Sequence, residues 1–249
     1  MKKHIMLKTY SLKKFNKNYY LKKILILVYF FSLPLGFLYS KSVNAQEDKK
    51  SISKSSKSSL SQSKTSEALL EIYQTEVSQI EEFLNNIRNL KAGFIQNIDE
   101  SKVEGIFYLS RNKESAGKMR IEYLAEPKVV IVANGSILSY HDIELDEISR
   151  LSTNTTPASF LTRPNIAFNS KDIEITNIEK NQDIIKISLL KKNRKDAGEF
   201  SLIFKINPLE FIKMEVKNDL GQKISVSLKN IEFPSSIPNK FFIIKDNNF

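Results

Sequence analysis

Residues 105–123 have the sequence GIFYLSRNKESAGKMRIEY, and this stretch decides the fold. Large apolar side chains recur at every second position on both sides of the polar segment 112–116, at Phe107 and Leu109 before it and at Met119, Ile121 and Tyr123 after it. A period of two places such side chains on one face of a β-strand. The stretch therefore predicts two antiparallel strands, joined by a short loop, that bury one face.

The same pattern continues on both sides of this stretch. Phe94 belongs to an alternating run before it, and the pair Asn134-Gly135, the strongest short hairpin signal, leads into another run that contains Tyr140. Further apolar runs lie at 129–132, 173–178, 184–190, 200–206, 211–216, 224–228 and 241–244, with turn residues at 196–198 and 219–221. Because the connections are short, we expect an antiparallel sheet that is mostly a meander.

Two segments follow a different period and predict helices. Residues 67–89 have apolar side chains at intervals of three and four, with acidic residues on the opposite face and Ser66 as a candidate N-cap. The apolar positions are Leu69, Ile72, Tyr73, Val77, Ile80, Phe83, Leu84 and Ile87. Residues 152–161 contain capping Thr residues, Pro157 and then apolar side chains, which predicts a short helix inside a β protein. Helices are the natural cover for the apolar face of a curled sheet.

The chain has 249 residues and a formal net charge of +10, but the charge is concentrated at the N-terminus. Nine of the 38 Lys and Arg side chains lie in residues 1–45, which contain no Asp or Glu. The rest of the chain therefore has 29 basic and 28 acidic side chains. A nearly neutral domain lacks the basic surface with which proteins bind phosphate backbones, so we expect no nucleic-acid partner.

The N-terminal segment predicts export from the cytoplasm. Two Lys residues precede an apolar run at 24–39, and Val43 and Ala45 have the spacing that a signal peptidase requires, so we expect cleavage after Ala45. An uncleaved membrane anchor is the alternative. It is disfavoured because a Pro and a Gly interrupt the run, which is short for a span of roughly 20 residues.

The remainder divides into a linker and one domain. Residues 46–66 are rich in Ser and Lys and almost free of apolar side chains, which predicts a disordered linker. Residues 67–249 have the length of a single domain. The chain contains no Cys, so this domain must fold without disulfides and cannot carry a lipid on a Cys after export. We expect a protein of the periplasm, in a cell with two membranes.

Over roughly residues 67–246 the sequence resembles the LolA-type periplasmic outer-membrane lipoprotein carrier family. Residues 105–111 match a Gly-x-apolar-x-apolar-x-Arg pattern, and residues 117–123 match Gly-Lys-apolar-Arg-apolar-x-Tyr. The other markers, in chain order, are 94–96, Pro127, Asn134-Gly135, Tyr140 and 156–161. The loop 112–116 departs from the family pattern, because it is longer and more polar than the usual Pro-containing turn.

The resemblance implies a mainly β fold with some α-helix. The expected architecture is an incomplete, unclosed antiparallel β-barrel of about ten to eleven strands, with a helical lid or plug over a hydrophobic cavity. The side chains implied to bind acyl chains are Phe94, Phe107, Leu109, Met119, Ile121, Tyr123, Leu138, Tyr140, Phe160 and Leu161. Arg111 matches the family's Arg that is implied to hydrogen-bond the lid when the cavity is empty, so we expect it to be the lid latch. We expect no catalytic residue, no metal and no cofactor.

The resemblance also implies a function and its partners. A monomeric periplasmic chaperone would bind the acyl chains of lipoproteins released from the inner membrane by an ABC-type complex, and deliver them to an outer-membrane acceptor. Because fold does not fix function, a periplasmic lipid-binding sensor or regulator, or a carrier of another lipid, is the alternative. A hydrolase built on Ser139, His141 and Asp142 is disfavoured, since on a strand Ser139 and His141 share a face and Asp142 points away.

Overall fold

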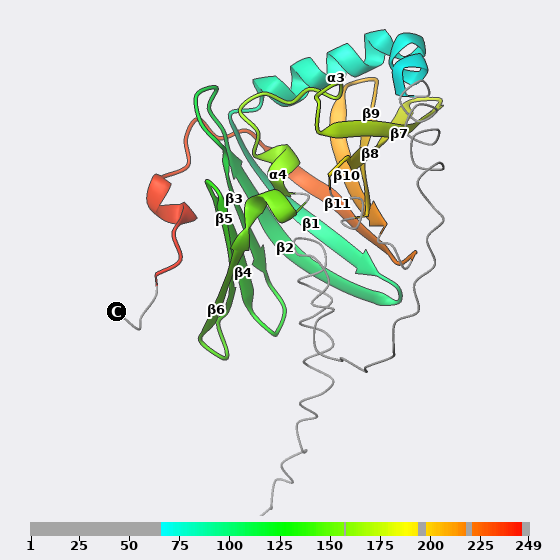
Figure 1. Ribbon diagram of the computed structural model, residues 1–249. Helices are drawn as coiled ribbons and strands as arrows, with labels where there is room; N and C mark the ends of the chain where they lie inside the picture. Colours follow the sequence, from blue (N-terminus) through cyan, green and yellow to red (C-terminus); the bar gives the residue numbers. More distant parts are fainter. Residues whose placement is uncertain (1–65, 157, 194–197, 218–220, 246–249) are drawn as a thin grey trace, which may run out of the picture.

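The computed structural model describes residues 66–156, 158–193, 198–217 and 221–245 (Figure 1). The predicted signal peptide, its cleavage site after Ala45, the linker up to residue 65 and Pro157 lie outside these residues, as do most of the predicted turns at 196–198 and 219–221. Within the described part of the chain, no helix is both long and apolar enough to cross a membrane.

Eleven strands form one antiparallel sheet that does not close (Figure 1). They are β1 Asn89–Ile98, β2 Ser101–Ser110, β3 Lys118–Tyr123, β4 Val129–Asn134, β5 Ile137–Asp142, β6 Glu147–Ser152, β7 Ile173–Asn181, β8 Ile184–Lys191, β9 Glu199–Lys205, β10 Glu210–Lys217 and β11 Lys223–Glu232. The order across the sheet is β6-β5-β4-β3-β2-β1-β11-β10-β9-β8-β7. Apart from the pairing of β1 with β11, all neighbours are consecutive in sequence, so the predicted meander and the unclosed sheet are confirmed.

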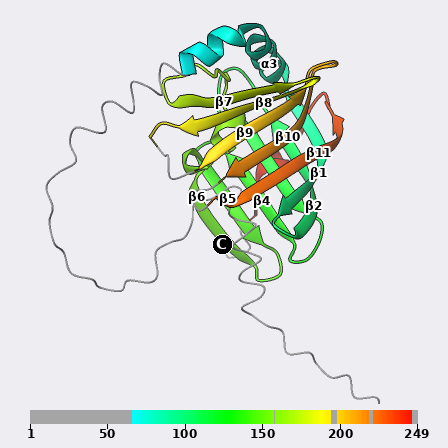
Figure 2. The same cartoon turned by 90° about the vertical axis from the view of Figure 1, so that its right-hand side faces the viewer.

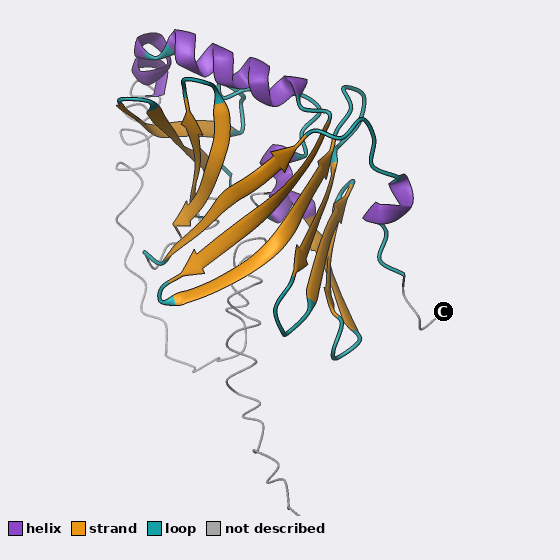
Figure 3. Cartoon of the chain, turned by 180° about the vertical axis from the view of Figure 1, so that it is seen from behind, coloured by secondary structure: helices purple, strands orange, loops and turns teal. Residues whose placement is uncertain are grey.

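The sheet curls into two halves that face each other, as the view from behind shows (Figure 3). Strands β7–β9 lie in one half and β3–β6 in the other, with β1, β2, β10 and β11 between them. Alternate side chains on every central strand are buried towards the concave side and form one continuous apolar core. This alternation is why the sequence folds as a half-barrel rather than as a flat sheet with two wet faces.

Helix α3 (Gln74–Asn86) lies across one end of the sheet (Figure 2). Val77, Ile80 and Leu84 are buried, as the spacing predicts, but the expected uninterrupted helix over 67–89 is wrong. The backbone departs from α-helical dihedrals at Tyr73, and helix α3 ends before β1 begins. Ile72 is 70% exposed, because Leu69, Leu70 and Tyr73 contact the core in its place. Ser66, the expected N-cap, is already helical, and its Oγ accepts a hydrogen bond from the backbone N–H of Ile175.

Two further expectations are corrected at the edges of the fold. Residues 241–244 do not form a strand, because the chain makes a 3₁₀ turn, η3 (Asn239–Phe242), against the convex face of β2–β4. There Phe242 is buried with Val130 and Val132. Conversely, the edge strand β6 was not predicted, because its side chains are mostly polar and exposed. The predicted short helix is present as two turns, η1 (Thr153–Thr155) and α4 (Ala158–Leu161).

Gly105 allows an aromatic ring to cross the strand β2. A Cβ atom built at Gly105 would lie 2.3 Å from Cζ of Phe94 and 2.4 Å from the backbone oxygen of Glu122. The Phe94 ring instead reaches Tyr123, with 5.5 Å between ring centroids in an edge-to-face arrangement. A glycine at this position therefore lets the side chains of Phe94 on β1 and Tyr123 on β3 meet over the backbone of β2.

We predict that Gly105→Ala lowers the free energy of unfolding by about 1–3 kcal/mol, because the added methyl group overpacks the core. Gly93→Ala on the adjacent strand is the matched control, since its Cβ would meet only the flexible Lys229 side chain at 3.0 Å and the Lys229 backbone oxygen at 3.5 Å. Urea unfolding of both variants measures the effect. Equal destabilisation by the two substitutions would contradict the role assigned to Gly105.

Glu215 on β10 is the centre of a charge cluster on the outer face of the sheet. Its side chain is 8% exposed, and its carboxylate lies 3.0–3.1 Å from the ammonium groups of Lys186, Lys213 and Lys223. Burial by itself would raise the pKa of Glu215, but hydrogen bonds from the three lysines outweigh it and lower the pKa to about 2.

A carboxylate with a lowered pKa in the folded state stabilises the fold above its unfolded-state pKa and loses that contribution as the pH falls. We predict that the wild type loses about 3 kcal/mol more stability than Glu215→Gln between pH 4.5 and pH 2. Urea unfolding across that range measures the difference, with Glu210→Gln, an exposed position on the same strand, as the control. Parallel pH profiles for the wild type and Glu215→Gln would contradict the assignment.

Candidate functional site

The ten side chains predicted to line the acyl cavity all lie in the one buried core cluster. Strand pairing aligns the eight strand residues in three neighbouring rows across β1–β5. The rows contain Phe94 and Tyr123; Phe107, Ile121 and Tyr140; and Leu109, Met119 and Leu138. Phe160 and Leu161 come from α4, on the concave side of the sheet (Figure 1). The structure therefore brings the predicted residues together on one apolar face, and their role in binding acyl chains stays a prediction.

A lid, defined as residues 153–156 and 158–161, covers this apolar face. Its side chains Phe160 and Leu161 are 3% and 4% exposed. The ring of Phe160 lies with its centroid 5.6 Å from that of Phe168 and 6.2 Å from that of Phe200 on β9. The lid thus packs against β9, and Phe160 and Leu161 belong to the same buried core cluster as the inner side chains of β2–β5.

Arg111, directly after β2, fastens the chain that leaves the lid to helix α3. Its Nη1 donates to the backbone oxygen of Leu84 at 2.6 Å, and its Nε and Nη2 donate to the backbone oxygen of Arg163 at 3.1 and 2.8 Å. Nη2 also lies 3.4 Å from Oδ1 of Asn85. Burial, together with the charge of Arg88, lowers the pKa of Arg111 to about 10, so the guanidinium remains charged at neutral pH.

The loop 112–116, which departs from the family pattern, folds onto itself and leaves Arg111 directed inwards. Oδ1 of Asn112 accepts hydrogen bonds from the backbone N–H groups of Glu114 and Ser115, at 3.1 and 2.8 Å. The loop then returns to Gly117, whose backbone N–H donates to the Thr162 oxygen at 2.6 Å. The two residues that flank the loop, Arg111 and Gly117, therefore bind the backbone oxygens of Arg163 and Thr162.

Helix α3 supplies further contacts that the sequence did not predict. The Asn85 side chain bonds the backbone of Ile166 twice, with Nδ2 donating to its oxygen at 2.9 Å and Oδ1 accepting from its N–H at 2.8 Å. Oε1 of Glu81 accepts from the backbone N–H of Phe168 at 2.6 Å. The polar edge of an amphipathic helix usually faces water, so only the tertiary structure identifies Glu81 and Asn85 as partners of the segment after the lid.

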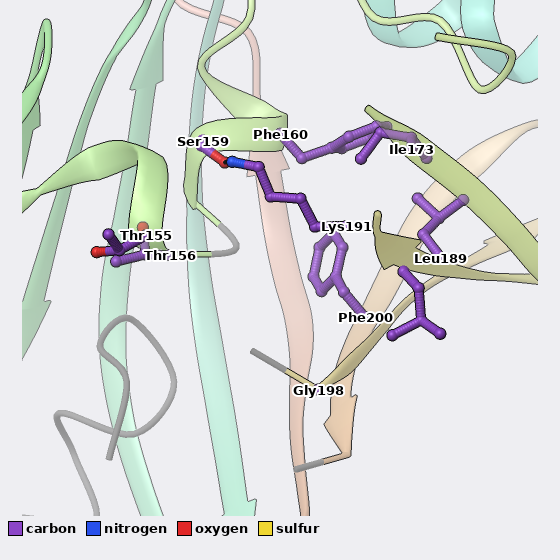
Figure 4. Close-up of a pocket in the computed structure, with 10 residues that line it drawn as sticks. Thr155, Thr156, Ser159, Phe160, Ile173, Leu189, Lys191, Gly198 and Phe200 are labelled. Carbon is purple, nitrogen blue, oxygen red and sulfur yellow. Dashed lines mark hydrogen bonds between the residues drawn. The ribbon is translucent and has the colours of Figure 1, made fainter. Parts of the chain in front are cut away.

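A pocket that is partly open to solvent lies between the lid and β7–β9 (Figure 4). The lid contributes Thr155, Thr156, Ser159 and Phe160, and the sheet side contributes Ile173, Leu189, Leu190, Lys191, Gly198 and Phe200. Lys191 crosses the pocket to the lid, where its Nζ donates to the backbone oxygen of Asn154 at 2.7 Å and lies 3.4 Å from Oγ of Ser159. Of these residues, only Phe160 was predicted to line the cavity.

The residues of the disfavoured hydrolase do not form a triad. Nε2 of His141 lies 3.3 Å from Oδ1 of Asp146, on an exposed hairpin, and Asp142 is buried on the opposite face of β5. Among the described residues, no three His, Cys, Asp or Glu side chains come close enough to hold a metal ion.

The fold is an unclosed antiparallel half-barrel whose apolar concave face is covered by a lid. Residues 85–245 match the family model described as outer membrane lipoprotein carrier protein LolA, and the chain belongs to this family. It is 27% identical to the outer-membrane lipoprotein carrier protein of Methylococcus capsulatus over 178 residues. This alignment covers 68% of this chain and 82% of that protein. The resemblance found in the sequence is thereby confirmed.

Solved structures also match this chain, at low sequence identity and with TM-scores below 0.5. A LolA superfamily protein from Nitrosomonas europaea has a TM-score of 0.39 and 13% identity, over 68% of this chain and 97% of that one. An uncharacterized conserved protein from Thermus thermophilus has a TM-score of 0.44 and 8% identity, over 70% and 95%. The MucA/MucB complex of Pseudomonas aeruginosa also matches, with a TM-score of 0.40 and 9% identity, over 68% of this chain and 60% of that one.

We predict that Arg111→Lys loosens the lid without unfolding the sheet. A lysine has one compact ammonium group and cannot bond both the Leu84 and the Arg163 oxygen in the guanidinium geometry, a loss of about 1–3 kcal/mol. Hydrogen exchange at the Gly117 and Ile166 amides should accelerate by about tenfold or more. Amides in β8 should be unchanged. Unaltered exchange at Gly117 and Ile166 would contradict the latch.

Proposed function

We propose that this chain is a periplasmic chaperone for lipoproteins. It binds the acyl chains of lipoproteins released from the inner membrane and delivers them to an outer-membrane acceptor. The observation that supports this most is the continuous apolar face, closed by a lid whose fastening is a small set of exchangeable hydrogen bonds to Arg111. Family membership supports the general carrier role, and a carrier of this kind performs no catalysis.

The energetics require such a face. A triacylated anchor exposes some forty methylene groups, and leaving them in water would cost on the order of 30 kcal/mol at about 0.8 kcal/mol each. A polar protein surface cannot offset this cost, whereas an apolar concavity can. The closed core indicates that acyl chains enter by displacing the lid side chains Phe160 and Leu161 from their places.

The latch makes binding reversible. When the lid moves, the guanidinium of Arg111 loses two bonds to the Arg163 oxygen, and each hydrogen bond of this kind to a charged group is worth about 1.5–3 kcal/mol. Closure after delivery restores these bonds and refills the space that the acyl chains leave. The latch therefore favours release of cargo once an acceptor is available.

The partners follow from the same proposal. An ABC-type complex of the inner membrane loads the carrier, and a lipidated acceptor of similar fold at the outer membrane unloads it. The signal peptide of residues 1–45, the linker of residues 46–66 and the single carrier domain of residues 67–249 belong to this proposal, as does a monomer in the periplasm.

The experiment uses spheroplasts, in which lipoproteins stay in the inner membrane unless a carrier is added. Purified residues 46–249 should release acylated lipoprotein into the soluble fraction as a complex, and should leave a transmembrane protein in place. Immunoblotting of the supernatant measures release. A folded domain that releases nothing, beside an active reference carrier, would contradict the proposal and favour a lipid-binding regulator or a carrier of another lipid.

Arg111→Leu tests the latch in transfer. We expect this variant to accept cargo but to retain it, because closure no longer regains the bonds to the Leu84 and Arg163 oxygens. Transfer to outer-membrane vesicles should fall about tenfold or more. Arg88→Leu removes an exposed, neighbouring Arg and should transfer normally. Normal transfer by Arg111→Leu would contradict the latch.

A further inference from the structure

Four polar side chains lie on the otherwise apolar concave face. Gln96 on β1, Tyr123 on β3 and Tyr140 and Asp142 on β5 are 0%, 5%, 7% and 3% exposed. Each is in phase with apolar core residues of its own strand, such as Phe94 beside Gln96 and Leu138 beside Tyr140, so all four belong to the inner face. Strand pairing places Tyr123 and Asp142 at the same end of this face. Val129 of β4 pairs with Asp142 of β5, and its neighbour Val130 pairs with Glu122, the residue before Tyr123 in β3.

Most of this polar capacity is unused within the protein. The hydroxyl of Tyr123 donates to Oε1 of Gln96 at 2.7 Å, and Oδ1 of Asp142 accepts from the backbone N–H groups of Glu144 and Leu145. Nε2 of Gln96, the hydroxyl of Tyr140 and Oδ2 of Asp142 are buried and have no hydrogen-bond partner. The inner face therefore carries an amide N–H donor, a hydroxyl and a carboxylate oxygen that have no partner within the described residues.

Stability does not explain this arrangement. A buried polar atom without a partner destabilises the fold, and an apolar residue of similar shape would be tolerated better at each position. Burial, followed by the charge of Asp142, raises the pKa of Tyr140, so its hydroxyl is protonated and can donate. The three atoms are instead suited to a bound molecule that both accepts and donates hydrogen bonds close to an alkyl chain.

We propose that Gln96, Tyr140 and Asp142 form a subsite for the uncharged polar linkage of an acyl lipid, with its carbonyl oxygen accepting from Gln96 or Tyr140 and its hydroxyl or amide N–H donating to Asp142. This inference rests on the proposed binding of acyl chains on the same face. The carboxylate of Asp142 disfavours a carboxylate or phosphate in its place, because like charges repel strongly where water is excluded. The subsite therefore selects neutral glyceryl esters and amides over free fatty acids.

The test compares two probes of equal chain length with the full mature chain, residues 46–249. Monodecanoylglycerol carries a neutral ester and two hydroxyls, and decanoate carries a carboxylate. Isothermal titration calorimetry at pH 7.5 should show the glyceride binding more tightly than decanoate. Asp142→Asn should reduce that preference by about three- to tenfold, the effect of one hydrogen bond or charge contact.

Two further variants separate the subsite from general packing. Tyr140→Phe should weaken glyceride binding about three- to tenfold and leave decanoate binding unchanged. Tyr108→Phe is the matched control, because it removes the same group from a partly buried tyrosine that lies on the convex face of the sheet, against Phe241. It should leave both affinities unchanged. Thermal melting confirms that each variant is folded.

The outcomes are distinguishable. Equal affinity for the two probes, or a preference that survives Asp142→Asn and Tyr140→Phe, would overturn the subsite and leave the acyl carrier intact. Binding of neither probe would overturn the subsite together with the proposed function. A diacylated lipopeptide, titrated in parallel, identifies the source of the linkage. If Asp142→Asn lowers the affinity for the lipopeptide, the linkage belongs to a lipoprotein anchor. If it lowers the affinity for the glyceride alone, the linkage belongs to a free lipid.

Discussion

The closed structure depends on the hydrogen bonds that the buried guanidinium of Arg111 donates. They join three segments that are distant in sequence, the last turn of α3, the end of β2 and the chain that leaves the lid. A charged group that is 7% exposed must keep hydrogen-bond partners, since burying it without them would cost several kcal/mol. Its position therefore ties the chain that leaves the lid to α3 and to the end of β2.

The apolar face explains why a lid is needed. A dry, empty concavity of the size of an acyl anchor would destabilise the fold, because each cubic ångström of unfilled volume loses packing contacts. In the structure the lid residues Phe160 and Leu161 are buried in the core on that face, and Phe168 and Phe200 pack against Phe160. In the proposed carrier the acyl chains replace these side chains, so the same face is satisfied with or without cargo.

The sequence predicted the parts of the fold that depend on periodicity. Alternation at 105–111 and 117–123 identified β2 and β3 and the side chains that they bury, because one face of each strand is dry. Periodicity failed where the environment differs: polar β6 has no buried face, and the apolar residues 241–244 cover the convex side of the sheet as a 3₁₀ turn. The contacts of the site join residues that are distant in sequence, such as Leu84 with Arg111, 27 residues apart, and Asn85 with Ile166, 81 residues apart, which no local pattern encodes.

In the proposed mechanism, the lid residues and the acyl chains occupy the same apolar face in turn. The most direct test is a crystal structure of residues 46–249 with a diacylated lipopeptide bound. We expect that Phe160 and Leu161 leave the core, that the acyl chains contact Phe107, Ile121 and Met119, and that the bonds from Arg111 to the Arg163 oxygen are broken. Acyl chains bound elsewhere, with the lid in place and these bonds intact, would contradict it.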